Sequence, residues 1–201
     1  MKIELPYSYD EITLEQIQKH NERDISNFEK LIIYTDHSVE YLKSCPQVLI
    51  DSAGERLDQI LDNVSQKHYK TISIDGVELG FIPNWDKLTA GEYIDLETYC
   101  KDPLTNAHKI MAILYRKITT KVAEKYNIVS YDEKEEANIF KRIPASYFTG
   151  CMVFFWNIRK ELLGSSLVSL AKMGQVNTTS SGGGMKRFSV WLMKRLSKWK
   201  K

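Results

Sequence analysis

Cysteine is scarce in this chain of 201 residues, and its few copies follow no ligand pattern. Three are present, Cys45, Cys100 and Cys151, far apart, odd in number and without a CxxC pair. This spacing excludes a secreted disulfide framework and gives no zinc site, so we expect buried, reduced thiols.

Long apolar runs and a leader sequence are missing as well. The longest uncharged stretch is residues 143–158, and its 16 residues fall short of the roughly 20 that span a bilayer. Acidic residues occupy the opening segment, where a signal peptide would be basic and then apolar. We therefore expect a chain that is not secreted and has no transmembrane segment.

Motifs of catalysis are also lacking. The four histidines show neither HxxH nor HExxH spacing, no GxSxG elbow occurs, and Gly182–Gly184 lacks the spacing of a phosphate loop. Asp86, Glu92 and Asp95 lie close together in sequence, but helix capping and the helix dipole explain them. We predict no catalytic residue, no metal site, no cofactor and no enzymatic activity.

The composition is that of a globular protein, with 43% hydrophobic and 27% charged residues. Apolar residues at three- and four-residue steps, with capping residues before them, predict helices. The expected helices begin after Thr13, cover about 25–34, 38–45, 49–64, 90–99 and 104–118, and include an aromatic-rich one from Pro144 to Leu162 or beyond.

A change of period between residues 70 and 82 predicts a β-hairpin. Thr71–Ile74 alternates in polarity, Asp75-Gly76 is a preferred two-residue turn, and the alternation resumes at Val77. The hairpin should lean on helices or pair with residues 2–9, which are an edge strand or an extended lead-in. Residues 119–142 are expected to be an exposed loop with a strand-like stretch at 127–129 and a short helix.

The predicted fold is therefore mainly α with a small antiparallel β-hairpin. A helical body covers residues 1–173, a small polar linker covers 174–184, and a basic amphipathic helix covers 185–201. The helix carries seven basic residues and no acid, whereas residues 1–184 have 21 basic and 26 acidic residues.

The C-terminal segment 185–201 is the candidate binding site. Its apolar anchors and neighbouring cations are Phe188, Trp191, Leu192, Leu196, Trp199, Lys194, Arg195 and Lys198. Such a segment docks into a groove on a partner protein, lies on an anionic membrane, contacts nucleic acid, or folds onto its own acidic body or a second copy in a homo-oligomer. We favour the partner protein.

Three segments carry a resemblance to a known group. They are GFIPNWDKLTAGEYIDL at 80–96, MAILYR at 111–116 and GCMVFFW at 150–156. In their order over roughly residues 10–163 they resemble small proteins from the structural-gene modules of tailed phages of Bacteroides-type hosts, the crAss-like phages among them. Some of these proteins are similar to tail assembly chaperones and others to virion proteins.

The resemblance implies a non-enzymatic role in particle structure or assembly. Our leading hypothesis is a phage structural or cargo protein that docks onto other phage proteins through residues 185–201. It would be found in the virion, and in the host cytoplasm during assembly. The alternatives are a soluble assembly chaperone for the tail or head, and a membrane- or nucleic-acid-binding module.

Overall fold

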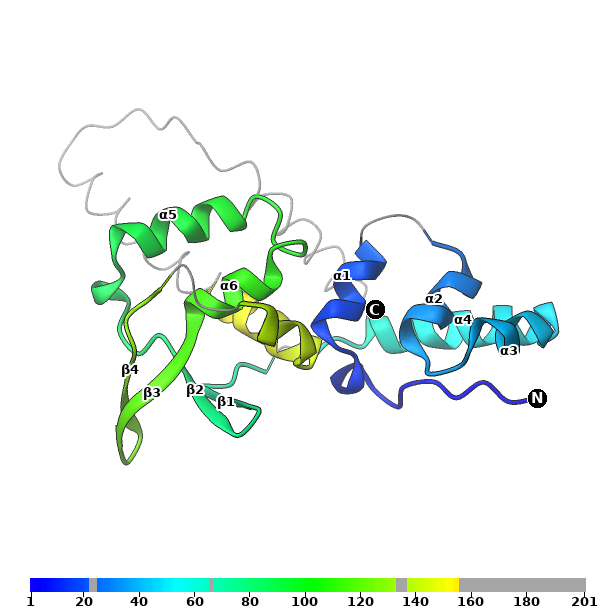
Figure 1. The fold of residues 1–201 in the computed structure, drawn as a ribbon, viewed down its shortest axis with the longest axis horizontal. Helices are drawn as coiled ribbons and strands as arrows, with labels where there is room; N and C mark the ends of the chain where they lie inside the picture. The colour runs from blue at the N-terminus through cyan, green and yellow to red at the C-terminus, as the bar shows by residue number, and fades with distance from the viewer. Residues whose placement is uncertain (22–24, 66, 133–136, 156–201) are drawn as a thin grey trace, which may run out of the picture.

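The computed structural model describes residues 1–21, 25–65, 67–132 and 137–155 (Figure 1). Over this part of the chain the fold is mainly α-helical with a small antiparallel sheet, which confirms the predicted class. The linker at 174–184 and the basic helix at 185–201 lie outside the described residues and remain predictions.

The N-terminal region is built from four α-helices that begin within two residues of the predicted positions. The elements are η1 (Tyr9–Glu11), α1 (Leu14–Asn21), α2 (Asn27–Tyr34), α3 (Val39–Ser44) and α4 (Gln47–Asp62). Capping boxes start α1 and α2: the hydroxyl of Thr13 accepts from the N–H of Gln16 at 3.3 Å, and that of Ser26 accepts from Glu29 at 3.3 Å. These bonds satisfy backbone donors that a helix start leaves unpaired.

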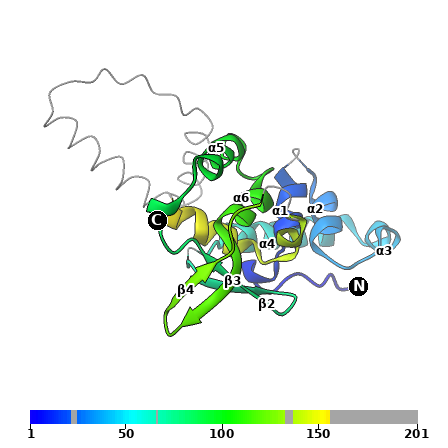
Figure 2. The ribbon, with the colours of Figure 1, turned by 60° about the vertical axis from the view of Figure 1, so that its left-hand side comes forward.

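Helices α2 and α4 lie side by side in both ribbon views (Figures 1 and 2). Leu31 of α2 and Leu57 of α4 are fully buried, and Lys30 of α2 pairs with Asp58 of α4 at 2.8 Å. Residues 1–65 hold thirteen acidic and six basic side chains. Residues 1–65 therefore hold half of the 26 acidic residues of the chain and have a net negative charge.

The sheet has four strands in the order β1-β2-β3-β4, and every pair is antiparallel. The strands are β1 (Thr71–Ile74), β2 (Val77–Phe81), β3 (Tyr115–Val122) and β4 (Lys125–Ile128). The predicted hairpin is confirmed: Asp75 and Gly76 form its turn with φ of 50° and 79°. This left-handed backbone favours the Asp-Gly pair.

For the middle of the chain one expectation is wrong and another is only partly right. The helix expected over 104–118 is only α6 (Ala107–Leu114), and the chain continues directly into β3. In the loop expected over 119–142 the end of β3 was not predicted, but the strand-like stretch at 127–129 overlaps β4 and the short helix is found as η3 (Ala137–Arg142). In a longer helix the backbone N–H and C=O groups after Leu114 would have bonded to one another. Here they bond to β2 instead, where Phe81 is opposite Tyr115. The N-terminal residues 2–8 form no strand.

The remaining elements cover the sheet and close the core. They are η2 (Trp85–Lys87), α5 (Ala90–Tyr99), and helical residues 145–155 after Pro144. The capping box predicted for α5 is confirmed, because the hydroxyl of Thr89 accepts from the N–H of Glu92. The predicted extension of the last helix to Leu162 lies outside the described residues.

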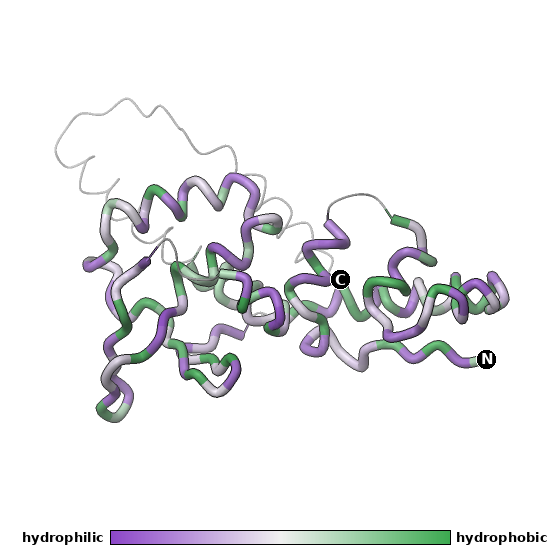
Figure 3. Tube along the Cα trace, in the orientation of Figure 1, coloured by the Kyte–Doolittle hydropathy of each residue, from purple (hydrophilic) through white to green (hydrophobic). Residues whose placement is uncertain are grey.

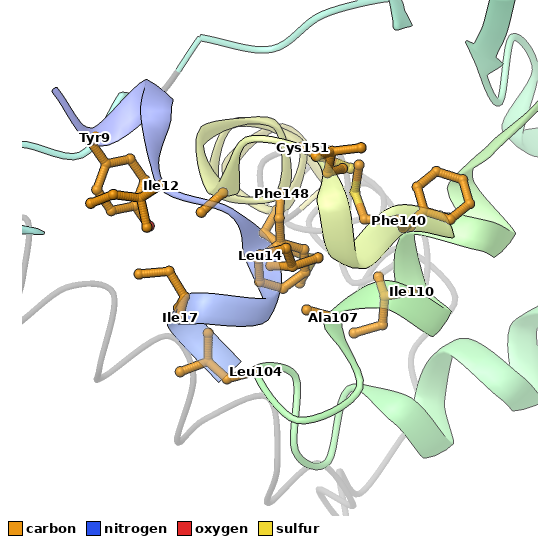
Figure 4. Close-up of a cluster of buried hydrophobic side chains, with 14 of the residues drawn as sticks. Tyr9, Ile12, Leu14, Ile17, Leu104, Ala107, Ile110, Phe140, Phe148 and Cys151 are labelled. Carbon is orange, nitrogen blue, oxygen red and sulfur yellow. The ribbon is translucent and has the colours of Figure 1, made fainter. Parts of the chain in front are cut away.

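The core joins the first helix to the last described one (Figure 4). The N–H of Leu14 donates to the carbonyl of Ile143 at 2.9 Å, and the N–H of Ala145 donates to the carbonyl of Ile12 at 2.7 Å. Leu14 and Phe148 are fully buried beside this crossing. The two ends of the described chain are thus fastened together through backbone bonds and apolar packing.

The molecule is elongated, with α2, α3 and α4 at one end and the sheet with α5 at the other (Figure 1). Residues 145–155, drawn in yellow, lie between the two ends. Hydrophobic and hydrophilic residues alternate along the elements instead of forming long runs (Figure 3). Both ends contribute to one continuous core among the described residues.

Candidate functional site

The predicted docking residues lie outside the described part of the chain. This holds for all eight of them: Phe188, Trp191, Leu192, Lys194, Arg195, Leu196, Lys198 and Trp199. Among the described residues, no group of three or more His, Cys, Asp or Glu side chains could hold a metal ion. In that same part of the chain, every helix is too short or too polar to cross a bilayer.

The structure instead reveals a pocket that the sequence did not predict. It has a volume of about 940 Å³ and lies between the start of α5, the stretch 124–131 that includes β4, and the end of β2. Its lining includes Arg116, Glu92, Trp85 and Tyr126. Protein sites for small ligands usually measure about 300–1,000 Å³, so this pocket has the size of a ligand site.

Strand alternation places Arg116 in this pocket. Successive residues of a strand point to opposite faces, and its neighbour Tyr115 is buried in the core at 1% exposure. Arg116 therefore points away from that core, toward α5, where its Nη1 lies 2.6 Å from Oε1 of Glu92. The ion pair fastens α5 to the sheet.

Glu92 has two roles at the start of α5. Its Oε2 accepts from the N–H of Thr89 at 2.6 Å, which completes the capping box, while Oε1 binds Arg116. The side chains of Glu92 and Arg116 are only 3% and 8% exposed. A charge this buried needs its partner, because leaving one of the two alone costs several kcal/mol.

An aromatic cluster centred on Phe81 forms one wall of the pocket. The ring of Phe81 meets those of Trp85, Tyr115 and Phe154 edge-on, with centroids 5.2–5.7 Å apart. Such edge-to-face contacts are favourable beyond the area they bury. They hold Trp85 and Phe154, both partly buried, at the pocket surface.

His68 belongs to the same wall and is neutral at physiological pH. Its ring stacks on Phe154 with centroids 4.1 Å apart and 1° between the planes. Burial, and then the charge of Lys70, lower the pKa of His68 from about 6.5 to about 4. Its Nδ1 is buried without a hydrogen-bond partner. The imidazole thus serves the pocket as an aromatic surface.

Tyr126 holds β4 against the rest of the sheet. Its hydroxyl lies 2.9 Å from two carbonyl oxygens, those of Lys70 and Phe81. The hydroxyl donates its single proton to this pair of acceptors. Its ring lies where the Cβ of any other residue at Gly80 would be, so a glycine is needed there. Burial and the nearby carboxylate of Glu78 raise the pKa of Tyr126. The hydroxyl therefore stays protonated as a donor.

The pocket is equipped for binding, with cationic and amide donors above an aromatic wall. The sequence correctly predicted that Glu92 caps a helix. It did not predict the ion pair of Glu92 with Arg116, because Arg116 was expected on a helix. The β-branched run Ile118, Thr119, Thr120 and Val122 was the signal for a strand there. A strand would have turned Arg116 and Tyr115 to opposite faces.

No family model, no curated protein and no solved structure matches this chain. A functional proposal for the chain therefore rests on its own residues and on the resemblance of residues 80–96, 111–116 and 150–156.

Proposed function

We propose that this chain is a non-enzymatic structural or cargo protein of a bacteriophage particle, docking onto other phage proteins through residues 185–201. The observation that carries the docking role is the pattern of this segment. Apolar residues recur at three- and four-residue steps among seven cations without one acid. An amphipathic helix of this kind suits an apolar groove with an acidic rim. The phage assignment rests on the resemblance of residues 80–96, 111–116 and 150–156.

The charges of the described residues support an acceptor outside the pocket. Lys70, Lys87 and Lys125 line the pocket and would repel a basic segment. The N-terminal helices carry the opposite charge, with thirteen acids against six bases in residues 1–65. These helices are the acceptor to test if the segment binds its own chain or a second copy.

The first test compares purified particles with the infected-cell lysate by quantitative mass spectrometry. We expect the chain in particles, in a fixed ratio to the major capsid protein. Its presence in the lysate alone would refute the virion role and point to an assembly chaperone.

The second test replaces the anchors. We expect Trp191→Ala with Trp199→Ala to abolish incorporation into particles, because aromatic anchors dominate docking energies. Ser189→Ala with Ser197→Ala, in the same segment, is the matched control and should be incorporated normally. Normal incorporation of the tryptophan variant would contradict docking through an apolar groove and favour contacts made by the cations alone.

Sedimentation of the purified full chain at low and high salt addresses self-association. A dimer that dissociates as salt is added would identify a second copy of the chain as the acceptor, and would replace other phage proteins in the proposal. A monomer at both salt concentrations agrees with a different protein as the partner.

A further inference from the structure

Positive charge converges on the pocket from separate parts of the chain. Lys70 precedes β1, Lys87 ends η2 and Lys125 begins β4, and all three are exposed. Among the described lining residues the acids are Glu92, which is paired with Arg116, and Glu124. The pocket therefore attracts anions, although the protein as a whole is nearly neutral.

Arg116 adds unused donor capacity to this charge. A guanidinium has five N–H donors, and buried donors are normally all bonded. Arg116 is 8% exposed, binds Glu92 through Nη1, and has no hydrogen-bond partner at Nε. A guanidinium with donors to spare suits the oxygens of a phosphate or carboxylate.

Aromatic side chains beside these cations favour a ligand that has a flat ring as well as a negative charge. Trp85, Tyr126 and Phe154 line the pocket and are only partly buried, so part of each side chain remains open to a ligand. A planar base that stacks on such a ring adds affinity, whichever base it is. Lysines next to open aromatic rings are the combination that recognises a phosphate joined to a flat base.

We propose that this pocket binds a nucleotide, with its phosphate near the lysines and Arg116 and its base against the aromatic wall. The volume of about 940 Å³ accommodates a ligand of this size. The same chemistry is offered by a free nucleotide and by the terminal nucleotide of a single strand. The inference goes beyond the docking role, because it assigns a ligand to the body of the protein and not to residues 185–201.

The test is calorimetric titration of the intact chain with adenosine monophosphate, adenosine and inorganic phosphate. We expect the monophosphate to bind at least about tenfold more tightly than either fragment, since charge-assisted bonds and stacking act together. No binding of the monophosphate, or equal binding of phosphate alone, would overturn the proposal. Binding of hexaglutamate as tight as that of the nucleotide would also overturn it, in favour of an acidic peptide.

Variants locate the binding in the pocket. Lys87→Ala with Lys125→Ala should weaken binding of the monophosphate about tenfold. The control, Lys43→Ala with Lys101→Ala, makes an equal change of charge at exposed residues outside the pocket and should leave binding unchanged. Trp85→Leu should reduce the affinity for the monophosphate to the affinity for inorganic phosphate. Circular dichroism verifies that each variant is folded. An equal loss in both lysine pairs would contradict the pocket as the site.

A 5′-phosphorylated tetranucleotide separates the two sources of the ligand. Binding at least about tenfold tighter than the monophosphate would indicate a strand end, because neighbouring phosphates add contacts. Equal binding would indicate a free nucleotide. Loss of binding to both in the pocket lysine variant is expected in either case.

Discussion

At the scale of single residues, Gly150 shows how closely the backbone of one segment can approach another. The helix of residues 145–155 crosses the segment before β1 at this point, and the hydroxyl of Thr149 donates to the carbonyl of Ser65 at 3.2 Å. A Cβ on Gly150 would collide with the carbonyl oxygen of Lys67. Because the obstacle is backbone, it cannot rotate away as a side chain could.

We therefore expect Gly150→Ala to lower the free energy of unfolding by about 2 kcal/mol or more, as overpacked cores do. Urea denaturation followed by circular dichroism measures this loss. The control is Gly91→Ala in α5, where the nearest atom to a new Cβ is Thr89 Oγ1 at 4.0 Å. It should stabilise the chain by about 0.5 kcal/mol, because alanine favours a helix over glycine. Equal effects of the two changes would contradict the predicted steric collision.

At the scale of elements, the contact between α5 and β3 depends on one buried ion pair. We expect Glu92→Gln to cost about 3–5 kcal/mol, because it leaves the guanidinium of Arg116 buried without a counter-charge. Thermal and urea unfolding measure the loss. The double change Glu92→Met with Arg116→Met should recover much of it, since no charge is then left unpaired.

A matched exposed pair tests whether burial is the cause. Arg142 and Asp75 lie at the same distance as the buried pair, 2.6 Å, but are 64% exposed. Asp75→Asn should change stability by less than about 1 kcal/mol, because water screens exposed pairs. If both pairs proved equally important, burial would not explain the effect at Glu92.

The sequence predicted the elements whose determinants are local. Thr13, Ser26 and Thr89 each stand three residues before the side chain that completes the capping box, so these helix starts could be identified without any tertiary contact. The turn at Asp75-Gly76 was equally local. Three- and four-residue spacing likewise predicted α4.

The missed elements depend on partners distant in the chain. The apolar run from Ile110 to Leu114 continues into Tyr115, and only pairing with β2 determines where helix gives way to strand. The pocket was missed for the same reason, since Arg116 meets Glu92 only once that strand exists. Of the candidate site, the sequence therefore predicted the capping role of Glu92 at the start of α5 but not the residues that surround it.

At the scale of the whole molecule, two histidines make stability depend on pH. Burial lowers the pKa of His68 to about 4, with Lys70 adding to the shift, and burial with Lys141 and Lys109 lowers that of His108 to about 4. Both values lie below the usual 6.5 of the unfolded chain, so the unfolded state binds more protons between these limits. The stability these residues contribute is complete above pH 6.5 and is lost as the pH falls toward 4.

We expect the free energy of unfolding to decrease from pH 7 to pH 5, and His68→Phe with His108→Asn to flatten that decrease. Phenylalanine keeps the stacking on Phe154, and asparagine offers an acceptor to Gln18, whose amide lies 3.0 Å from Nδ1 of His108. Denaturant titrations at several pH values measure the slope. An unchanged slope in the double variant would show that other groups cause it.

The backbone bonds between residues 12–14 and 143–145 have a consequence for synthesis on the ribosome. Translation releases Ile12 and Leu14 about 130 residues before the carbonyl and amide that they bind. During most of translation the first helix therefore lacks the part of its cover that residues 143–148 later provide, although α2 can already pack against it. Nascent chains that stop before this contact forms would expose the uncovered part of this helix to chaperones and proteases. The fold is therefore completed only late in translation.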